Sequence, residues 1–92
     1  LRPSSWPPRR VTIYSKPDCC LCDHAKEALA RVSSRGYTLE VQEVDITSSA
    51  ELFERYRYRI PVVTIDGAEA AEGKVSEHRL LTALKRLQGG LD

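Results

Sequence analysis

The stretch YSKPDCCLC, residues 14–22, decides how the rest of this chain folds. It places Cys19 and Cys22 in a C-x-x-C pair between a strand-like and a helix-like segment, an arrangement typical of an intracellular redox motif. The first thiol then lies near a helix N-terminus, where free backbone N–H groups and the helix dipole favour a thiolate. The second follows about one helical turn later, close enough to form a disulfide with the first.

The segments on either side of this motif predict an alternating α/β chain. In the first helix, Cys22, Ala25, Leu29 and Val32 recur at helical spacing, with Lys26, Glu27 and Arg31 largely on the other side. In the second strand the apolar alternation is irregular after Val41, so we expect a bulge or twist there. The expected elements begin with a strand at 11–14, a helix from 19 or 20 to 34 and a strand at 38–45. A short helix follows, opened by the capping-box pattern SSAE at 48–51. Strands at 62–65 and 68–72 are then joined by a turn at Asp66-Gly67, and Ser76 caps a last helix. The order β-α-β-α-β-β-α predicts a four-stranded mixed sheet with helices on both faces.

Composition excludes several broad classes of function. The 92 residues carry a net charge of +1, which predicts no general attraction to nucleic acid or to an anionic membrane. No apolar run approaches the roughly 20 residues that span a bilayer. All three cysteines lie within residues 19–22, whereas a secreted disulfide framework spreads its cysteines along the chain. We therefore expect a soluble protein of a reducing compartment, the cytosol or alternatively the mitochondrial matrix, and a monomer.

The chain resembles the glutaredoxin branch of the thioredoxin superfamily, from Val11 to Leu87. The resemblance rests on the C-x-x-C pair at the start of the first helix, on Ile60-Pro61 before the third strand, and on the hairpin before the last helix. The stretches KPDCCLCD at 16–23, VDIT at 44–47 and RIPV at 59–62 are similar to those of small glutaredoxin-like proteins with a C-x-L-C motif. This reading divides the chain into a flexible lead-in at 1–10, a glutaredoxin-like domain at 11–88 and a tail at 89–92. Because the chain begins with Leu1 and not Met, we expect a processed or trimmed fragment.

The resemblance implies a thiol–disulfide oxidoreductase that uses Cys19 and Cys22 as its catalytic residues. Cys19 is the expected nucleophile and Cys22 the expected resolving thiol, with no bound cofactor and no metal in the site. Cys20, which points away from the core, is either a bystander or an additional site of oxidation or glutathionylation. His24, on the solvent side of the first helix, reads as a surface histidine.

Binding of the substrate is the second implication. The resemblance places Pro61 in a cis peptide opposite the cysteines, with the N–H and C=O of Ile60 turned outward to pair with an extended peptide or with glutathione; an ordinary trans-proline is the alternative. The residues expected to bind substrate are Lys16, Leu21, Arg59, Ile60, Pro61 and Ser76. Arg57 and Arg59 supply cations for carboxylates, unless they belong to a solvated loop. Members of the family that use glutathione carry a pair of glycines, and here only Gly73 of that pair is present. The resemblance therefore leaves two reductants open for recycling the protein, glutathione or a thioredoxin-reductase-type donor.

Two other functions remain open from the sequence. Cys19, Cys20, Cys22 and His24 are suitable ligands for zinc or copper(I), although neighbouring ligands on one helical turn point in different directions. A milder version of this reading is an iron–sulfur cluster shared between two chains and completed by external thiols. The third reading is a thioredoxin-fold interaction protein that does not catalyse a reaction. The expected substrates of the first reading, the oxidoreductase, are protein disulfides.

Overall fold

The computed structural model describes residues 8–89, with side chains described as far as Leu87. Residues 1–7 of the expected lead-in (1–10) and residues 90–92 of the expected tail (89–92) lie outside this range. The observed elements are β1 (Arg9–Ser15), α1 (Cys20–Ser34), β2 (Leu39–Asp45), a 3₁₀ turn (Ile46–Ser48), α2 (Ala50–Tyr56), β3 (Val62–Ile65), β4 (Ala68–Glu72) and α3 (Glu77–Gly89). Apart from the added 3₁₀ turn, this is the predicted order. None of these helices is long and apolar enough to cross a membrane.

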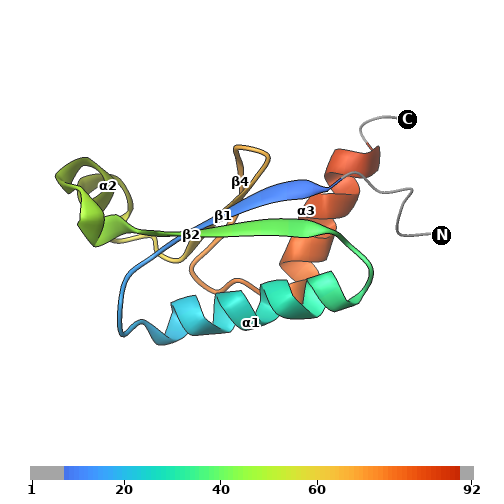
Figure 1. Ribbon diagram of the computed structural model, residues 1–92, viewed down its shortest axis with the longest axis horizontal. Coiled ribbons are helices and arrows are strands. Elements are labelled where there is room, and N and C mark those ends of the chain that lie inside the picture. The colour runs from blue at the N-terminus through green and yellow to red at the C-terminus, as the bar shows by residue number, and fades with distance from the viewer. Residues whose placement is uncertain (1–7, 90–92) are drawn as a thin grey trace.

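The four strands form one mixed sheet in the order β2-β1-β3-β4 (Figure 1). The crossover through α1 makes β1 and β2 parallel, and β3 runs antiparallel to both β1 and β4. The predicted four-stranded mixed sheet is therefore confirmed. One of its two central strands, β1, leads directly into the cysteine motif.

The main core lies between one face of the sheet and the helices α1 and α3. Alternate residues of β1, Val11 and Ile13, point into it and are at most 1% exposed. The partners from the helices include Leu29 and Leu80, and burial of side chains of this size contributes about 1.5–3 kcal/mol each. This packing fixes α1, and with it the cysteines, against the sheet.

A smaller apolar cluster covers the other face of the sheet. Ile46, Tyr56 and Val62 are buried together there, and Tyr14 of β1 stacks on Tyr56 with ring centroids 4.4 Å apart. Because Tyr14 alternates with Ile13 along β1, the two clusters lie on opposite faces. The short helix α2 thus covers the face away from α1, which confirms helices on both sides.

Of the bulge or twist expected in the second strand, the bulge is wrong. Residues of β2 pair with β1 without interruption, from Arg9 with Leu39 to Ser15 with Asp45. Val41 is 50% exposed, because β2 is an edge strand whose side chains need not alternate strictly between core and solvent. The irregularity in the sheet lies instead between β3 and β4, at Val63 and Thr64.

The first strand begins at Arg9, two residues earlier than expected. The Arg9 N–H donates to the Thr38 carbonyl at 2.9 Å, and Asp66 of the β3–β4 turn accepts from the Arg9 guanidinium at 2.8 Å and from the Arg10 N–H at 3.0 Å. Asp66 and Gly67 both have positive φ, as a two-residue hairpin turn requires. The turn therefore holds the start of β1, an interaction between residues distant in sequence.

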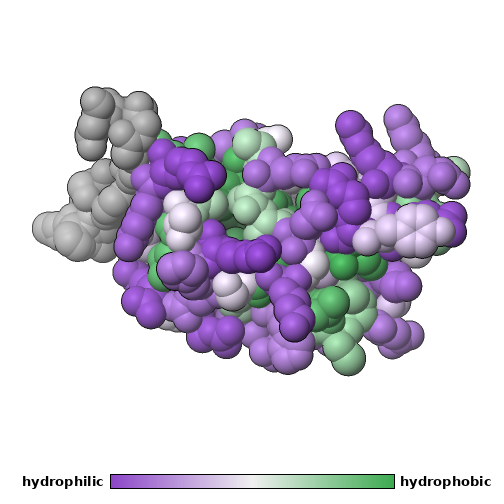
Figure 2. Space-filling model, turned by 180° about the vertical axis from the view of Figure 1, so that it is seen from behind, coloured by the Kyte–Doolittle hydropathy of each residue, from purple (hydrophilic) through white to green (hydrophobic). Residues whose placement is uncertain are grey.

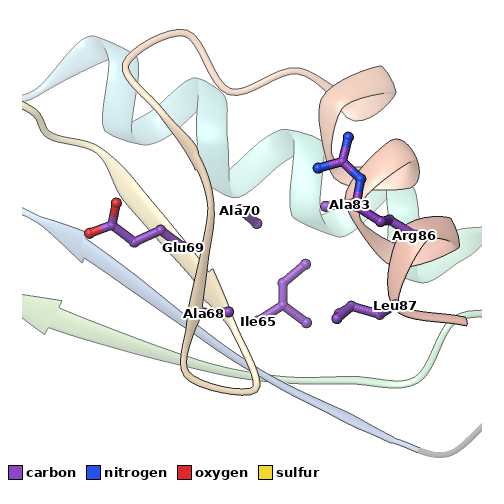
Figure 3. A pocket seen from close by; sticks show the side chains of 7 residues that line it. All are labelled: Ile65, Ala68, Glu69, Ala70, Ala83, Arg86 and Leu87. Carbon is purple, nitrogen blue, oxygen red and sulfur yellow. The ribbon is translucent and has the colours of Figure 1, made fainter. Parts of the chain in front are cut away.

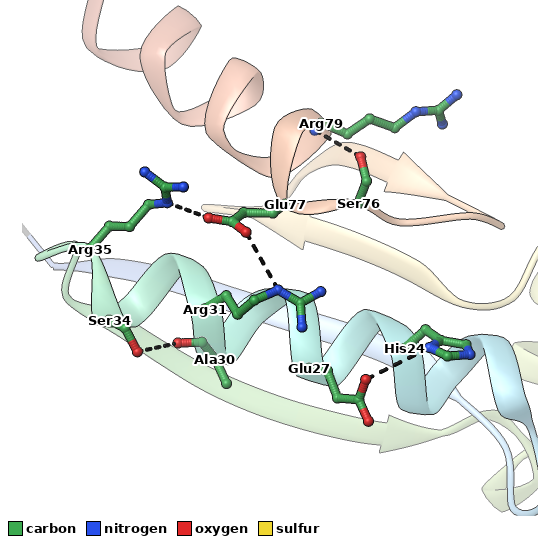
Figure 4. A network of polar contacts seen from close by, with 9 residues as sticks. All are labelled: His24, Glu27, Ala30, Arg31, Ser34, Arg35, Ser76, Glu77 and Arg79. Atoms are coloured by element: carbon green, nitrogen blue, oxygen red, sulfur yellow. Dashed lines mark hydrogen bonds and ion pairs between the residues drawn. The ribbon is translucent and has the colours of Figure 1, made fainter.

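The helices α2 and α3 begin at serine hydroxyls that act as caps. Ser49 Oγ accepts from the Leu52 N–H at 3.0 Å, so Ser49 and not Ser48 caps α2, because Ser48 is occupied in the 3₁₀ turn. Ser76 Oγ accepts from the Arg79 N–H at 3.1 Å at the start of α3, as predicted (Figure 4). In the same view Glu77 joins α3 to α1 through ion pairs with Arg31 and Arg35.

Candidate functional site

The loop between β1 and α1 brings the two predicted catalytic cysteines together. Cys19 is the N-cap of α1 in an extended conformation, and its Sγ accepts a hydrogen bond from the Cys22 backbone N–H at 3.2 Å. The sulfur thus takes the place of the usual capping oxygen, at the end of the helix where the dipole favours negative charge. Asp18, just before it, has a φ of 57°, a conformation that aspartate tolerates better than most residues. The loop therefore presents a half-buried Cys19 at the surface.

Cys22 lies one turn further along, and only 1% of it is exposed. Burial raises the pKa of its thiol to about 11, and its hydrogen bond with Cys19 acts in the same direction. The backbone of Lys16 and the charge of Lys26 lower this pKa in part. At neutral pH Cys22 is therefore a thiol that contacts the sulfur of Cys19, the arrangement expected of an accessible nucleophile and a protected resolving group.

The two residues between the cysteines face solvent. Cys20 is exposed at the first position of α1, and Leu21 is 41% exposed. Cys20 is therefore reachable by oxidants, and both readings of it remain open. Leu21 presents an exposed apolar side chain between the two cysteines.

Ile60 and Pro61 lie at the same end of the sheet as the cysteine loop. Their peptide bond is cis, as expected, and the pairing of Tyr14 with Val62 places Pro61 beside Ser15 at the end of β1. The Ile60 N–H was expected to turn outward and pair with a substrate. This expectation is wrong, because the N–H donates to the Tyr56 carbonyl at 3.1 Å. This hydrogen bond belongs to the turn that follows α2. Of the two backbone groups of Ile60, the carbonyl is therefore the one whose binding to a substrate is to be tested.

Two of the residues expected to bind substrate have partners within the chain. The Arg59 guanidinium bonds to the Glu72 carboxylate at 2.9 Å and also to Glu69. This pairing occupies the guanidinium donors that were expected to bind a substrate carboxylate. The hydroxyl of Ser76 serves as the α3 cap described above. Arg57 instead packs over the rings of Phe53 and Tyr58 at the surface, 5.1 and 4.5 Å from their centroids.

Sequence reasoning missed a charged pair beside the buried thiol. Lys26 Nζ lies 2.8 Å from the Glu43 carboxylate, which also accepts from the Ser15 hydroxyl at 2.9 Å. Both contacts lower the pKa of Glu43. The only signal in the sequence was the position of Lys26, four residues after Cys22 on the same helix.

Lys16 faces a hollow of about 360 Å³ next to the cysteine loop. Its walls come from residues 15–18, from Asp23 and Lys26 of α1, and from Glu43 and Asp45 of β2. His24 lies outside it, exposed on α1 with Nδ1 3.7 Å from Glu27 (Figure 4). Among residues 8–89, no group of three or more histidine, cysteine or carboxylate side chains is arranged to hold a metal ion.

The rest of the described surface shows less chemistry. A smaller hollow of about 170 Å³ between β4 and α3 is lined mainly by apolar side chains, together with Glu69 and Arg86, and by no cysteine (Figure 3). On the face turned away in Figure 1, hydrophilic side chains predominate and apolar ones form small, separate areas (Figure 2). The cysteine loop is therefore the strongest candidate site.

Comparisons with known proteins agree with this geometry. Residues 10–85 match the family described as Glutaredoxin-like domain (DUF836). Uncharacterized proteins of Mycobacterium bovis and Mycobacterium tuberculosis are 32% identical to the chain over 81 residues, which is 84% of each sequence.

Solved structures show the same fold. A structural-genomics target protein from X. campestris aligns with a TM-score of 0.70 and 32% identity, over 83% of this chain and 96% of that one. The germline-specific thioredoxin Deadhead of Drosophila melanogaster aligns with a TM-score of 0.56 and 21% identity, over 86% of this chain and 80% of its own. The second likeness supports the thioredoxin fold alone.

Proposed function

The chain belongs to the glutaredoxin-like domain family, and from this premise we propose that it is a thiol–disulfide oxidoreductase acting through Cys19 and Cys22. One observation supports the proposal most strongly. The Cys19 sulfur caps α1 and accepts the Cys22 N–H, while the Cys22 thiol is buried and hydrogen-bonded to Cys19. A nucleophile and its resolving partner need this difference in exposure.

The reaction that this geometry supports has two exchange steps. The Cys19 thiolate attacks one sulfur of a substrate disulfide, and the other sulfur leaves as a thiolate that takes up a proton. Cys22 then loses its proton and attacks the Cys19 sulfur of the mixed disulfide, which releases the second substrate thiol. The substrate gains two electrons, and the protein is left with a Cys19–Cys22 disulfide.

The substrates that we propose are protein disulfides and mixed disulfides with glutathione. Lys16 offers a cation near Cys19, Leu21 an apolar contact, and the Ile60 carbonyl an acceptor for a peptide N–H. Arg59 and Ser76 are weaker candidates, because each already has partners within the chain. Either glutathione or a thioredoxin-reductase-type donor would return the disulfide to the dithiol, in a reducing compartment such as the cytosol or the mitochondrial matrix.

The test is a titration in glutathione redox buffers, followed by acid quenching and mass spectrometry. The protein is expected to form a reversible Cys19–Cys22 disulfide, and Cys22→Ser is expected to collect one glutathione on Cys19. Cys19→Ser should form neither, and Cys20→Ser is the matched control that should behave as the unmodified chain. If no Cys19–Cys22 disulfide forms at any buffer ratio and Cys19 takes up no glutathione, the proposal is wrong.

A further inference from the structure

The proposed reaction has a difficulty at its second step. Cys22 must become a thiolate, yet it is almost fully buried and its pKa is raised to about 11. At pH 7 such a thiol is ionised in roughly one molecule in ten thousand. A positive charge close to Cys22 would increase that fraction, because an opposite charge favours the ionised form.

Lys26 is the cation that the structure places there. It lies four residues after Cys22 on α1, so the two side chains leave the helix on the same side. Each influences the charge state of the other: Lys26 lowers the pKa of Cys22, and a Cys22 thiolate raises that of Lys26. Lys26 is thus positioned to influence the ionisation of the resolving thiol, while Cys22 itself remains the group that reacts.

Glu43 of β2 fixes the position of this cation. Its carboxylate lies 2.8 Å from Lys26 Nζ and accepts from the hydroxyl of Ser15, which is 2% exposed. Asp23 is a second, longer partner at 3.8 Å. A flexible lysine is therefore held between the helix and the sheet, and its pKa is raised by Glu43, so that it keeps its charge.

The other charges around this hollow set the size of the effect. Lys16 and Asp18 face it from the loop, Asp23 from α1, and Glu43 and Asp45 from β2. Four carboxylates against two cations limit the help that Lys26 gives. We therefore expect a rate effect of about three- to tenfold, that of a single partly screened charge.

We propose that Lys26, held by Glu43, is a positioning residue that stabilises the Cys22 thiolate during attack on the mixed disulfide. This inference rests on the proposed function. The Cys22 proton passes to water, the thiolate pair forms the bond to the Cys19 sulfur, and the bond from Cys19 to the substrate sulfur breaks. The substrate thiolate leaves with that electron pair and is protonated, while Lys26 keeps its proton throughout.

The experiment separates the two steps with 5,5′-dithiobis(2-nitrobenzoate) in a Cys20→Ser background. The first nitrothiobenzoate is released when Cys19 attacks the reagent, and the second when Cys22 resolves the adduct. Lys26→Met is expected to slow the second release about three- to tenfold and to shift its pH profile upward, with the first release changed less than about twofold. Lys26→Arg should restore the second release, and Lys85→Met, at an exposed position of α3, is the matched control.

A second measurement does not depend on catalysis. In a Cys19→Ala, Cys20→Ser protein, the pH dependence of Cys22 alkylation is expected to shift upward when Lys26 becomes Met. Equal profiles with and without Lys26, or a second release that changes no more than in Lys85→Met, would overturn the proposal. Absence of the second release from the Cys20→Ser protein itself would instead contradict the dithiol function, and the alkylation profiles would still decide the role of Lys26.

Discussion

The sulfur of Cys19 accepts the backbone N–H of Cys22 at 3.2 Å, so the first cysteine of the motif caps the helix that contains the second. The hydrogen bond holds the Cys19 sulfur against the first turn of the helix that carries Cys22. It also explains how neighbouring thiols acquire different roles: one lies at the open end of the helix, and the other is turned into the core.

Cys22 should resist alkylation in the folded protein. Its side chain is buried and its pKa is about 11, so few thiolates form at neutral pH and reagents have little access. With iodoacetamide at pH 7.5, about tenfold slower labelling is expected at Cys22 than at Cys19, as measured by tandem mass spectrometry. All three cysteines should react in urea, and equal labelling of Cys22 before unfolding would contradict the prediction.

Loss of the α2 cap should destabilise the fold by a measurable amount. Ser49→Ala removes the acceptor of the Leu52 N–H and is expected to lower the free energy of unfolding by about 1 kcal/mol. Urea denaturation measures the change. The matched control is Ser48→Ala, one residue earlier in the 3₁₀ turn, which should cost clearly less. An equal loss in both variants would show that the cap is not the cause.

The core beneath the cysteine helix should be intolerant of truncation. Ile13 is fully buried between the sheet and α1, so Ile13→Ala is expected to cost about 2–5 kcal/mol. Val41→Ala on the edge strand, half exposed, should cost less than about 1 kcal/mol. The two variants are compared by thermal and urea unfolding, and similar losses would argue against the observed packing.

Acid should weaken the fold through carboxylates that form ion pairs. Contacts with Lys26, Arg9 and Arg35 lower the pKa values of Glu43, Asp66 and Glu77 respectively. Because the folded pKa lies below the unfolded one, their stabilisation is present above the ordinary values of 4.5 for Glu43 and Glu77 and 3.8 for Asp66, and it is lost as the pH falls through the folded values.

The free energy of unfolding should therefore decline below about pH 4.5. The measurement is urea unfolding between pH 7 and pH 3, and Asp66→Asn should show a shallower decline than the unmodified chain. The effect per group is small, because these side chains are partly exposed. A stability that does not change across this range would contradict the observed pairing.

Arg59 should matter little for binding of the substrate. Its guanidinium bonds to Glu69 and Glu72, so Arg59→Gln is expected to raise KM for a glutathione mixed disulfide less than Lys16→Gln does. Steady-state kinetics of both variants provide the comparison. A larger rise for Arg59→Gln would show that its ion pairs open to admit a ligand.

Much of the fold followed from local patterns. Helical spacing of Cys22, Ala25 and Leu29 located α1, and Asp66-Gly67 located the hairpin, because each pattern has a short-range physical cause. The edge strand was harder to predict: Val41 resembles a core residue but is half exposed. Which strand lies at an edge is a property of the whole sheet. Irregular alternation in an edge strand therefore resembles a bulge in the sequence, whereas the observed irregularity lies between β3 and β4.

The sequence by itself determined the C-x-x-C pair, the element order and the family, since these depend on residue types and spacing. Only the tertiary structure decided the surroundings of the pair. Glu43 is brought from β2 to Lys26, the Ile60 N–H is taken up by the turn after α2, and the Arg59 guanidinium is bound by carboxylates of β4. The contacts of Lys26 with β2 and of Arg59 with β4 join residues whose separation in the chain gives no sign of their distance in space, because packing of the sheet and helices sets that distance.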